Sequence, residues 1–144
     1  MTHLRFRNMH IDGPSIATWS DALLRLTADF ELVIDETVLY RQPEFPIVEL
    51  ASQLHVWLVC GATTAFQYES MDSDENPLIW FRPNSTGWIV GVRHPLTPQA
   101  YEVRHGDLVS ATRAFLIAVD DEAFVVGKVK LLQVLIDPTR PPRG

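Results

Sequence analysis

The sequence predicts an α+β domain with one antiparallel sheet of about five to six strands and two amphipathic helices packed on one of its faces. Stretches in which apolar and polar residues alternate are separated by turn residues, which is typical of half-buried strands. Two other stretches repeat apolar residues at spacings of three and four, which is typical of helices. Because 47% of the 144 residues are hydrophobic, the chain can fill one core without a disulfide or a metal.

The N-terminal part of the chain predicts strands and one undecided segment. Residues 3–11 alternate apolar and polar side chains until a turn. Apolar residues at every second position over residues 24–34 predict a long strand, and a short turn joins it to a further strand over residues 37–42. Residues 15–21 fit either a loop or a helical turn.

The second half of the chain predicts the remaining strands. Residues 64–71, 78–83 and 87–94 read as three antiparallel strands, the last two joined by a hairpin loop that ends in glycine. Residues 99–105 add a further edge strand. Residues 123–136 suit a final strand and a helical extension equally well.

Two segments predict helices. Residues 47–59 form an amphipathic helix that follows a proline, and Gly61 supplies its C-terminal cap. Asp107 is the expected N-cap of the second helix. The buried face of that helix is expected to consist of Leu108, Ala111, Ala114, Phe115, Ala118 and Val119. Residues 1–137 then form one domain, and residues 138–144 form a loose tail because their prolines cannot continue an element.

Charge and composition exclude several classes of function. The formal net charge of −6 argues against nucleic acid as a partner, because phosphate binding needs a basic face. No apolar stretch reaches the ~18 residues of a membrane span. The single cysteine, Cys60, and the lack of a leader at the N-terminus predict a reduced, cytoplasmic protein. The acidity favours a basic protein partner through complementary charge.

An acidic stretch between two apolar segments is the first candidate site. Asp72, Asp74 and Asn76 match the first ligand positions of a calcium-binding EF-hand loop. The match then fails, because Pro77 stands where glycine must turn the chain and Pro83 stands where a bidentate glutamate is needed. The sequence therefore predicts no metal site in this stretch.

Catalytic signatures are also lacking. The sequence has no HExxH pair, no nucleophile elbow and no glycine-rich phosphate loop, so it predicts no cofactor. Cys60 lies at a helix C-terminus, where the helix dipole disfavours a thiolate. Glu69 with Asp72 could form a carboxylate pair only if one of them were desolvated, and neither has a partner that the sequence identifies.

The aromatic residues suggest a binding surface. Trp80 and Phe81 are consecutive on a strand, so their rings point to opposite faces of the sheet. If helices cover one face, the other face carries a large ring beside acidic residues, as protein-binding patches do. The candidate contact residues for a protein partner are Tyr68, Glu69, Asp72, Asp74, Glu75 and Trp80.

One resemblance adds to this interpretation. Residues 39–51 with Leu54, Trp57 and Leu58, the stretch FQYESM, and Gly87-Trp88 together resemble small, uncharacterised single-domain bacterial proteins of the actinobacterial type. The resemblance covers residues 4–119, implies an α+β domain and brings no catalytic residues. In size and acidity the chain is also similar to immunity proteins of bacterial toxin systems.

These observations lead to one main hypothesis and two alternatives. The main hypothesis is a non-enzymatic cytoplasmic binding protein, most concretely an immunity-type inhibitor of a basic toxin or another basic protein. The first alternative is a small hydrolase-like enzyme with a pocket between sheet and helices that uses Glu69 or His94. The second is an accessory protein that forms oligomers, such as a homodimer, through the edge strand at residues 99–105.

Overall fold

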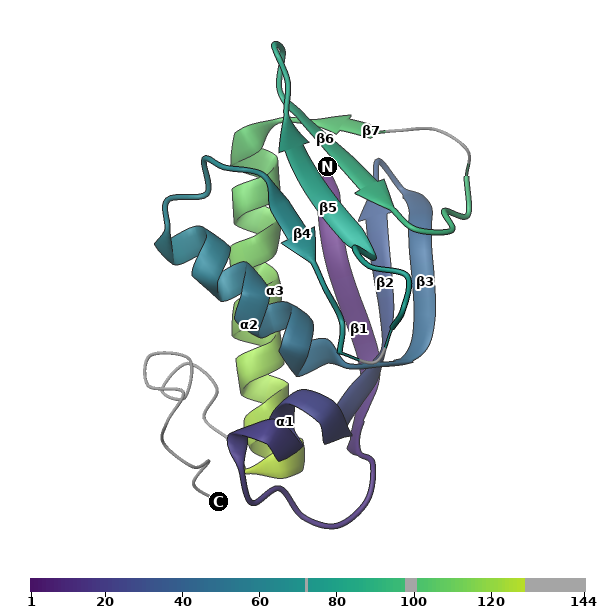
Figure 1. Cartoon of the computed structure of the whole chain (residues 1–144), viewed down its shortest axis with the longest axis vertical. Coiled ribbons are helices and arrows are strands. Elements are labelled where there is room, and N and C mark those ends of the chain that lie inside the picture. Colours follow the sequence, from purple (N-terminus) through teal and green to yellow (C-terminus); the bar gives the residue numbers. More distant parts are fainter. Residues whose placement is uncertain (72, 98–100, 129–144) are drawn as a thin grey trace.

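The computed structural model describes residues 1–71, 73–97 and 101–128 of the chain. Three helices and seven strands follow one another in these ranges (Figure 1). In chain order they are β1 (Thr2–Ile11), α1 (Trp19–Arg25), β2 (Leu26–Ile34), β3 (Thr37–Phe45), α2 (Ile47–Val59), β4 (Phe66–Tyr68), β5 (Ile79–Pro83), β6 (Trp88–Val92), β7 (Tyr101–Val103) and α3 (His105–Gly127).

The described strands form two antiparallel sheets, in the orders β1-β2-β3 and β4-β5-β6-β7. The α+β class is confirmed, but the prediction of one sheet of about five to six strands was wrong. Alternation reports which way each side chain points and says nothing about which strands pair. Here α2 stands between β3 and β4 in the chain and packs against both β2 and β4, so the two halves of the chain build separate sheets (Figure 1).

The undecided segment forms a third helix. Thr18 caps α1 by accepting a hydrogen bond from the backbone N–H of Asp21, and the Asp21 carboxylate accepts one from the backbone N–H of Thr18. This reciprocal capping box starts a helix that runs through Leu24, a residue the alternation had assigned to a strand. The strand β2 consequently begins two residues later, at Leu26.

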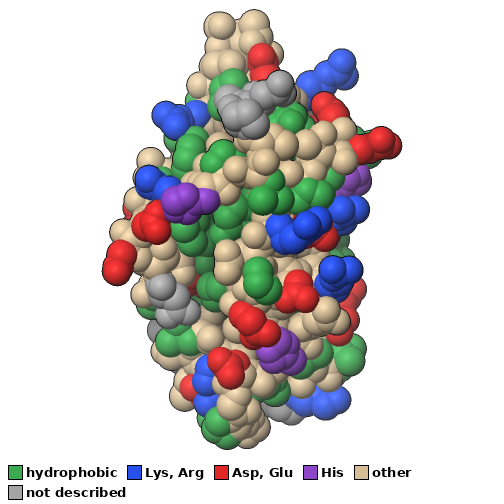
Figure 2. Space-filling view, turned by 90° about the vertical axis from the view of Figure 1, so that its right-hand side faces the viewer, with side chains coloured by type: hydrophobic (Ala, Val, Ile, Leu, Met, Phe, Trp, Pro, Cys, Tyr) green, Lys and Arg blue, Asp and Glu red, His purple; other side chains and the backbone are tan. Residues whose placement is uncertain are grey.

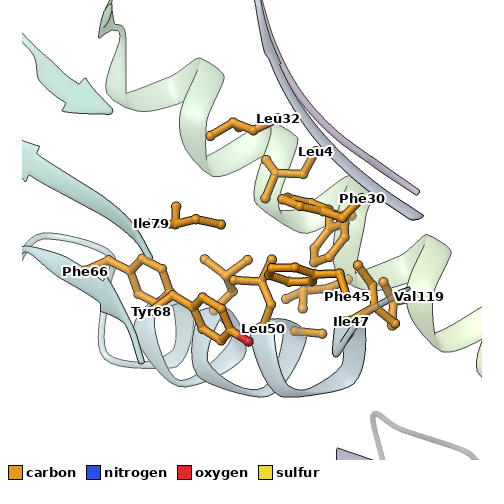
Figure 3. Packing of buried hydrophobic residues seen from close by; sticks show 14 of the residues in the cluster. Leu4, Phe30, Leu32, Phe45, Ile47, Leu50, Phe66, Tyr68, Ile79 and Val119 are labelled. Atoms are coloured by element: carbon orange, nitrogen blue, oxygen red, sulfur yellow. The ribbon is translucent and has the colours of Figure 1, made fainter. Parts of the chain in front are cut away.

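The central strand β2 supplies much of the core. Its apolar positions are fully buried as the alternation predicts: Leu26, Ala28, Phe30, Leu32 and Ile34. The ring of Phe30 stacks on that of Phe45 with 4.9 Å between centroids. Figure 3 shows Phe30 and Phe45 in the same cluster as Ile79, Phe66 and Tyr68 of the second sheet and Leu50 of α2, so one core joins both sheets and the helix.

The helices agree with the prediction in position but not in every detail. The bounds of α2 are those expected, and Gly61 follows it with a positive φ of 100° that suits a C-terminal cap. Asp107 lies inside the first turn of α3, whose N-cap is Arg104, so the predicted cap was wrong. Of the six residues expected to be buried on α3, Ala114 and Ala118 are exposed and Ala111 is half-buried.

The predicted edge strand is present, and the C-terminal segment is described only in part. The edge strand expected at residues 99–105 is β7, which borders the second sheet at Tyr101–Val103. The first part of the open segment 123–136 continues α3 as far as Gly127, and residues 129–144, including the tail expected at 138–144, lie outside the described residues. Within the described ranges no helix is long and apolar enough to span a membrane.

Candidate protein-binding site

The acidic loop, defined as residues 69–76, connects β4 to the segment that leads into β5. Helix α2 holds the start of this loop. The Gln53 side chain donates to the carbonyl of Glu69 at 2.8 Å and accepts from the N–H of Glu69 at 3.1 Å. Such a two-bond clamp fixes the position of the Glu69 backbone, while its side chain remains exposed.

A buried carboxylate lies beneath the loop. Glu49 of α2 is 3% exposed, and its Oε1 accepts a 2.6 Å hydrogen bond from the hydroxyl of Tyr68. Its Oε2 accepts from the N–H of Met71 at 3.1 Å. Burial, with the hydrogen bond to Glu49, raises the pKa of the Tyr68 hydroxyl, so this group acts as a donor throughout the physiological range. Through these two hydrogen bonds Glu49 links α2 to β4 and to the acidic loop.

Asn76 closes the loop on itself. Its Oδ1 accepts from the N–H of Ser70 at 2.9 Å, and its Nδ2 donates to the carbonyls of Ser70 and Ser73 at 2.8 and 2.9 Å. Three of the backbone groups of the loop therefore find a partner in one amide side chain. Side chains of this type often replace regular secondary structure in tight turns.

The end of β6 holds the other side of the loop. Arg93 donates from Nε to the carbonyl of Glu75 and from Nη2 to the carbonyl of Asn76, both at 3.1 Å. The imidazole of His94 lies 2.5 Å from the carboxylate of Glu75 through its Nε2. The loop is thus attached to α2 on one side and to the end of β6 on the other.

A groove of about 410 Å³ opens between this loop and the end of β3. Arg41 and Glu44 of β3 line it opposite Glu75, Arg93 and His94. Figure 2 shows that this side of the molecule carries acidic, basic and histidine side chains around hydrophobic surface. The groove itself contains charges of both signs. The acidic character of the site therefore comes from the exposed carboxylates of the neighbouring loop.

The predicted contact residues fall into separate environments. Glu69, Asp74 and Glu75 are exposed on the loop, and Glu75 is paired with His94. Asp72 lies outside the described residues. Tyr68 is 0% exposed, because its ring fills the core and its hydroxyl binds Glu49, so it has no surface to offer a partner.

Trp80 lies on the outer face of the second sheet. Its neighbour Phe81 is 0% exposed, whereas Trp80 is half-buried, as the opposite directions of consecutive strand residues require. The indole lies flat across Gly91, where an added Cβ would come within 2.2 Å of the ring. The Arg82 guanidinium lies over the same ring at 5.5 Å from its centroid. The indole is therefore fixed between a glycine and a cation.

The two residues named for the enzyme alternative, Glu69 and His94, have different partners. In the described structure Glu69 is held through its backbone by Gln53, while His94 pairs with Glu75. No group of three or more His, Cys, Asp or Glu side chains in the described ranges is placed to hold a metal ion. The loop can offer carboxylates to a cationic surface.

Comparison with known proteins identifies a family. A family model described as a domain of unknown function, DUF7878, matches residues 7–123, which run from within β1 to within α3. The chain belongs to the DUF7878 family. Searches of curated proteins and of solved structures gave no match. The matched region of this DUF7878 domain includes the strands β2 to β7, the helix α2 and the whole acidic loop.

The residues that support the acidic loop in this DUF7878 domain were missed by the sequence reasoning. Glu49 stands between Val48 and Leu50 on a helix whose other N-terminal positions are apolar, and this is the one signal that could have indicated a buried charge. Gln53 and Arg93 offered no such signal, because their partners are backbone groups that only the fold brings within reach.

Proposed function

We propose that this DUF7878 domain is a non-enzymatic binding protein that recognises a basic protein partner through its acidic loop. The contacts are assigned to Glu69, Asp74 and Glu75, with Asp72 as a further carboxylate of the same stretch and Trp80 as an aromatic contact on the neighbouring sheet face. In the most concrete form of the proposal the protein works in the bacterial cytoplasm as an immunity-type inhibitor, and its carboxylates cover the cationic site of a toxin.

One observation carries the proposal: the loop is held in place from both sides while the side chains of Glu69 and Asp74 are exposed. Gln53 and Glu49 hold its start, and Arg93 and His94 hold its end. A loop that is already ordered loses little conformational freedom when a partner binds, so more of the contact energy appears as affinity.

The exposed apolar surface beside the carboxylates also supports a protein partner. Met71 is 65% exposed in the loop, two residues after Glu69. Methionine adapts its shape to irregular surfaces, and it is enriched in the central parts of protein interfaces. A small inorganic or organic cation would not use such a side chain.

Affinity capture from a lysate of the source organism tests the proposal. The wild-type chain is compared with a loop variant, Glu69→Gln with Asp74→Asn, and with a control variant, Glu36→Gln with Asp121→Asn. Both variants lose two exposed carboxylates, so they have the same net charge. We expect the wild type and the control variant to retain a basic protein that the loop variant does not retain. Equal retention by all three chains would contradict the proposal.

A further inference from the structure

A second groove, of about 600 Å³, lies between β1 and α3. Residues 3–9 of β1 line it without interruption, which corresponds to a length of roughly 20 Å in an extended strand. The strand β1 is at the edge of the first sheet, with β2 as its one strand neighbour in the described structure. In Figure 1 the helix α3 runs beside this strand, so the groove has a strand edge as one wall and a helix as the other.

The backbone of β1 presents unused hydrogen-bonding groups to this groove. The N–H of Asp35 donates to the carbonyl of Met1 at 2.9 Å, so the pair Met1–Asp35 is a hydrogen-bonded one. Such pairs alternate with non-bonded ones in an antiparallel ladder, and β1 pairs with β2 without a shift as far as Arg7. The odd-numbered residues of this stretch therefore bond to β2, while the N–H and C=O groups of Leu4 and Phe6 point to the free edge.

The helix wall leaves room for another chain. The residues of α3 that line the groove include Ala111, Ala114 and Ala118, which are exposed or half-buried and have the smallest side chains that a helix wall can carry. Beside them, Phe115 packs edge-on against Phe6 with 6.0 Å between ring centroids and forms an apolar floor. An added strand needs about 4.8 Å of lateral space from β1, and small side chains on the helix keep that space open.

The charge of the groove is opposite to that of the acidic loop. His3, Arg5 and Arg7 are exposed along β1, and Glu122 is the one acidic side chain among the described residues that line the groove. Arg5 lies 3.8 Å from the carboxylate of Glu31, which makes a closer contact of 3.1 Å with Arg41. Arg7 makes no ion pair shorter than 4 Å in the described structure, but it lies opposite Asp29 of β2 and helps to lower the pKa of that carboxyl group. The groove therefore offers a row of cationic groups at alternate positions of a strand.

This row of charges disfavours a second copy of the chain as the occupant. Two β1 strands paired antiparallel about a two-fold axis at Arg5 would place Arg5 opposite its own copy and Arg7 opposite His3. Like charges directly opposite each other destabilise a sheet. An extended segment with acidic residues at every second position would pair each of these cations with a carboxylate.

We propose that the groove between β1 and α3 binds an extended acidic segment of a partner protein, which adds as a strand to the free edge of β1. Its backbone bonds to Leu4 and Phe6, its carboxylates face His3, Arg5 and Arg7, and its intervening small or β-branched side chains face the alanines of α3. This surface differs from the acidic loop in charge and in the elements that form it. The present proposal therefore does not depend on the function proposed above.

Peptide display on the full chain tests this proposal. A random library of peptides of about ten residues, long enough to span β1, is selected on the wild-type protein and counter-selected on Ala118→Glu. We expect the enriched peptides to carry Asp or Glu at alternate positions. Enrichment of peptides without this pattern, or no enrichment over the counter-selected protein, would overturn the proposal. In that case the charges of β1 serve only to prevent association between sheet edges of two molecules.

Fluorescence titration of an enriched peptide then locates the site. Ala118→Glu should weaken binding by about tenfold or more, because it fills the groove and repels the carboxylates. Ile117→Glu adds the same charge at the adjacent exposed residue of α3 and should leave the affinity within about twofold. Equal loss in both variants would contradict the assignment of the groove.

Backbone probes separate strand addition from mere charge attraction. In the free protein the amides of Leu4 and Phe6 should exchange rapidly with solvent deuterium, and an enriched peptide should protect both. N-methylation of the peptide at alternate residues should abolish binding in one frame and leave it unchanged in the other. Unchanged exchange at both amides, or equal effects of both methylation frames, would overturn the strand-addition geometry.

Discussion

Glu49 is the residue on which the position of the acidic loop most depends. Its two carboxylate oxygens bind the hydroxyl of Tyr68 and the N–H of Met71 in a site that is almost closed to solvent. A carboxylate that loses a donor in such a site keeps its desolvation cost and gains nothing in return. The loop geometry and the stability of the core are therefore coupled at this residue.

The Tyr68→Phe variant tests this coupling. It should lower the free energy of unfolding by about 1.5–3 kcal/mol, because Oε1 of Glu49 loses its described donor. Tyr101→Phe is the matched control, since the Tyr101 hydroxyl contacts Thr97 at only 3.4 Å, and it should cost less than about 0.5 kcal/mol. Urea unfolding measures both, and equal costs would show that the Glu49–Tyr68 contact contributes little.

A second residue-scale prediction concerns pH. The Nδ1 of His10 lies 2.8 Å from the carbonyl of Asn8, and its Nε2 lies 3.0 Å from the carboxylate of Glu44. The bond to Asn8, together with Glu44, raises the pKa of His10 above its usual value of 6.5. The protonated form is thus favoured in the folded state, so its stabilisation is present in full below that usual pKa and is lost as pH rises through the folded pKa.

We therefore expect the free energy of unfolding to fall as the pH rises above 6.5, by an amount that His10→Gln removes. Glu44→Gln should reduce the slope but not abolish it, because the bond to Asn8 remains. Chemical denaturation at a series of pH values measures the slope. The same slope in the wild type and in His10→Gln would refute the role of this histidine.

At the scale of elements, the second sheet depends on the fit between Trp80 and Gly91. These residues lie opposite each other on β5 and β6, and the indole occupies the space where a side chain on Gly91 would lie. A glycine within a strand often marks such a close approach. The fit between these two residues thus fixes the position of the side chain that the proposed function assigns to an aromatic contact.

Gly91→Ala should destabilise the protein by about 1–3 kcal/mol, because the new methyl group meets the indole ring. In a Trp80→Ala background the same substitution should cost far less, and a double-mutant cycle measures the difference. Gly106→Ala is the control, since nothing lies within 4 Å of the added methyl, and it should leave stability unchanged or slightly raised. Equal costs of Gly91→Ala in both backgrounds would contradict this packing.

The elements also show which features of the fold a sequence pattern can predict. The alternation in β2 and the periodicity of α2 were sufficient to predict both, because each pattern reports the direction of its own side chains. The separation into two sheets could not be predicted, because strand pairing depends on contacts between residues far apart in the chain. The alanines of α3 were assigned to the core by the same periodicity, whereas they line the groove beside β1.

The candidate site, too, could be predicted from the sequence only in part. The exposure of Asp74 follows from its place in a charged turn, and the outward direction of Trp80 follows from its buried neighbour Phe81. Glu69 was assigned to the strand over residues 64–71, whereas it lies just past the end of β4. The supports of the loop from Gln53 and Arg93 depend on tertiary contacts with backbone groups, which leave no mark in a sequence pattern.

At the scale of the whole molecule, the two proposed surfaces belong to different sheets and carry opposite charge. The acidic loop leads into the second sheet, while the basic groove lies along the free edge of the first. The net charge of −6 therefore conceals a separation of charge between two parts of the surface. The two proposals are compatible with each other, because neither surface uses residues of the other.

Calorimetric titration of the captured basic partner tests the central claim most directly. Glu69→Gln with Asp74→Asn should weaken binding by about fivefold to thirtyfold and reduce its dependence on salt, because each exposed charge pair contributes up to about 1 kcal/mol. The control variant Glu36→Gln with Asp121→Asn, which has the same net charge, should bind like the wild type. An unchanged affinity and salt dependence in the loop variant would contradict recognition through the acidic loop.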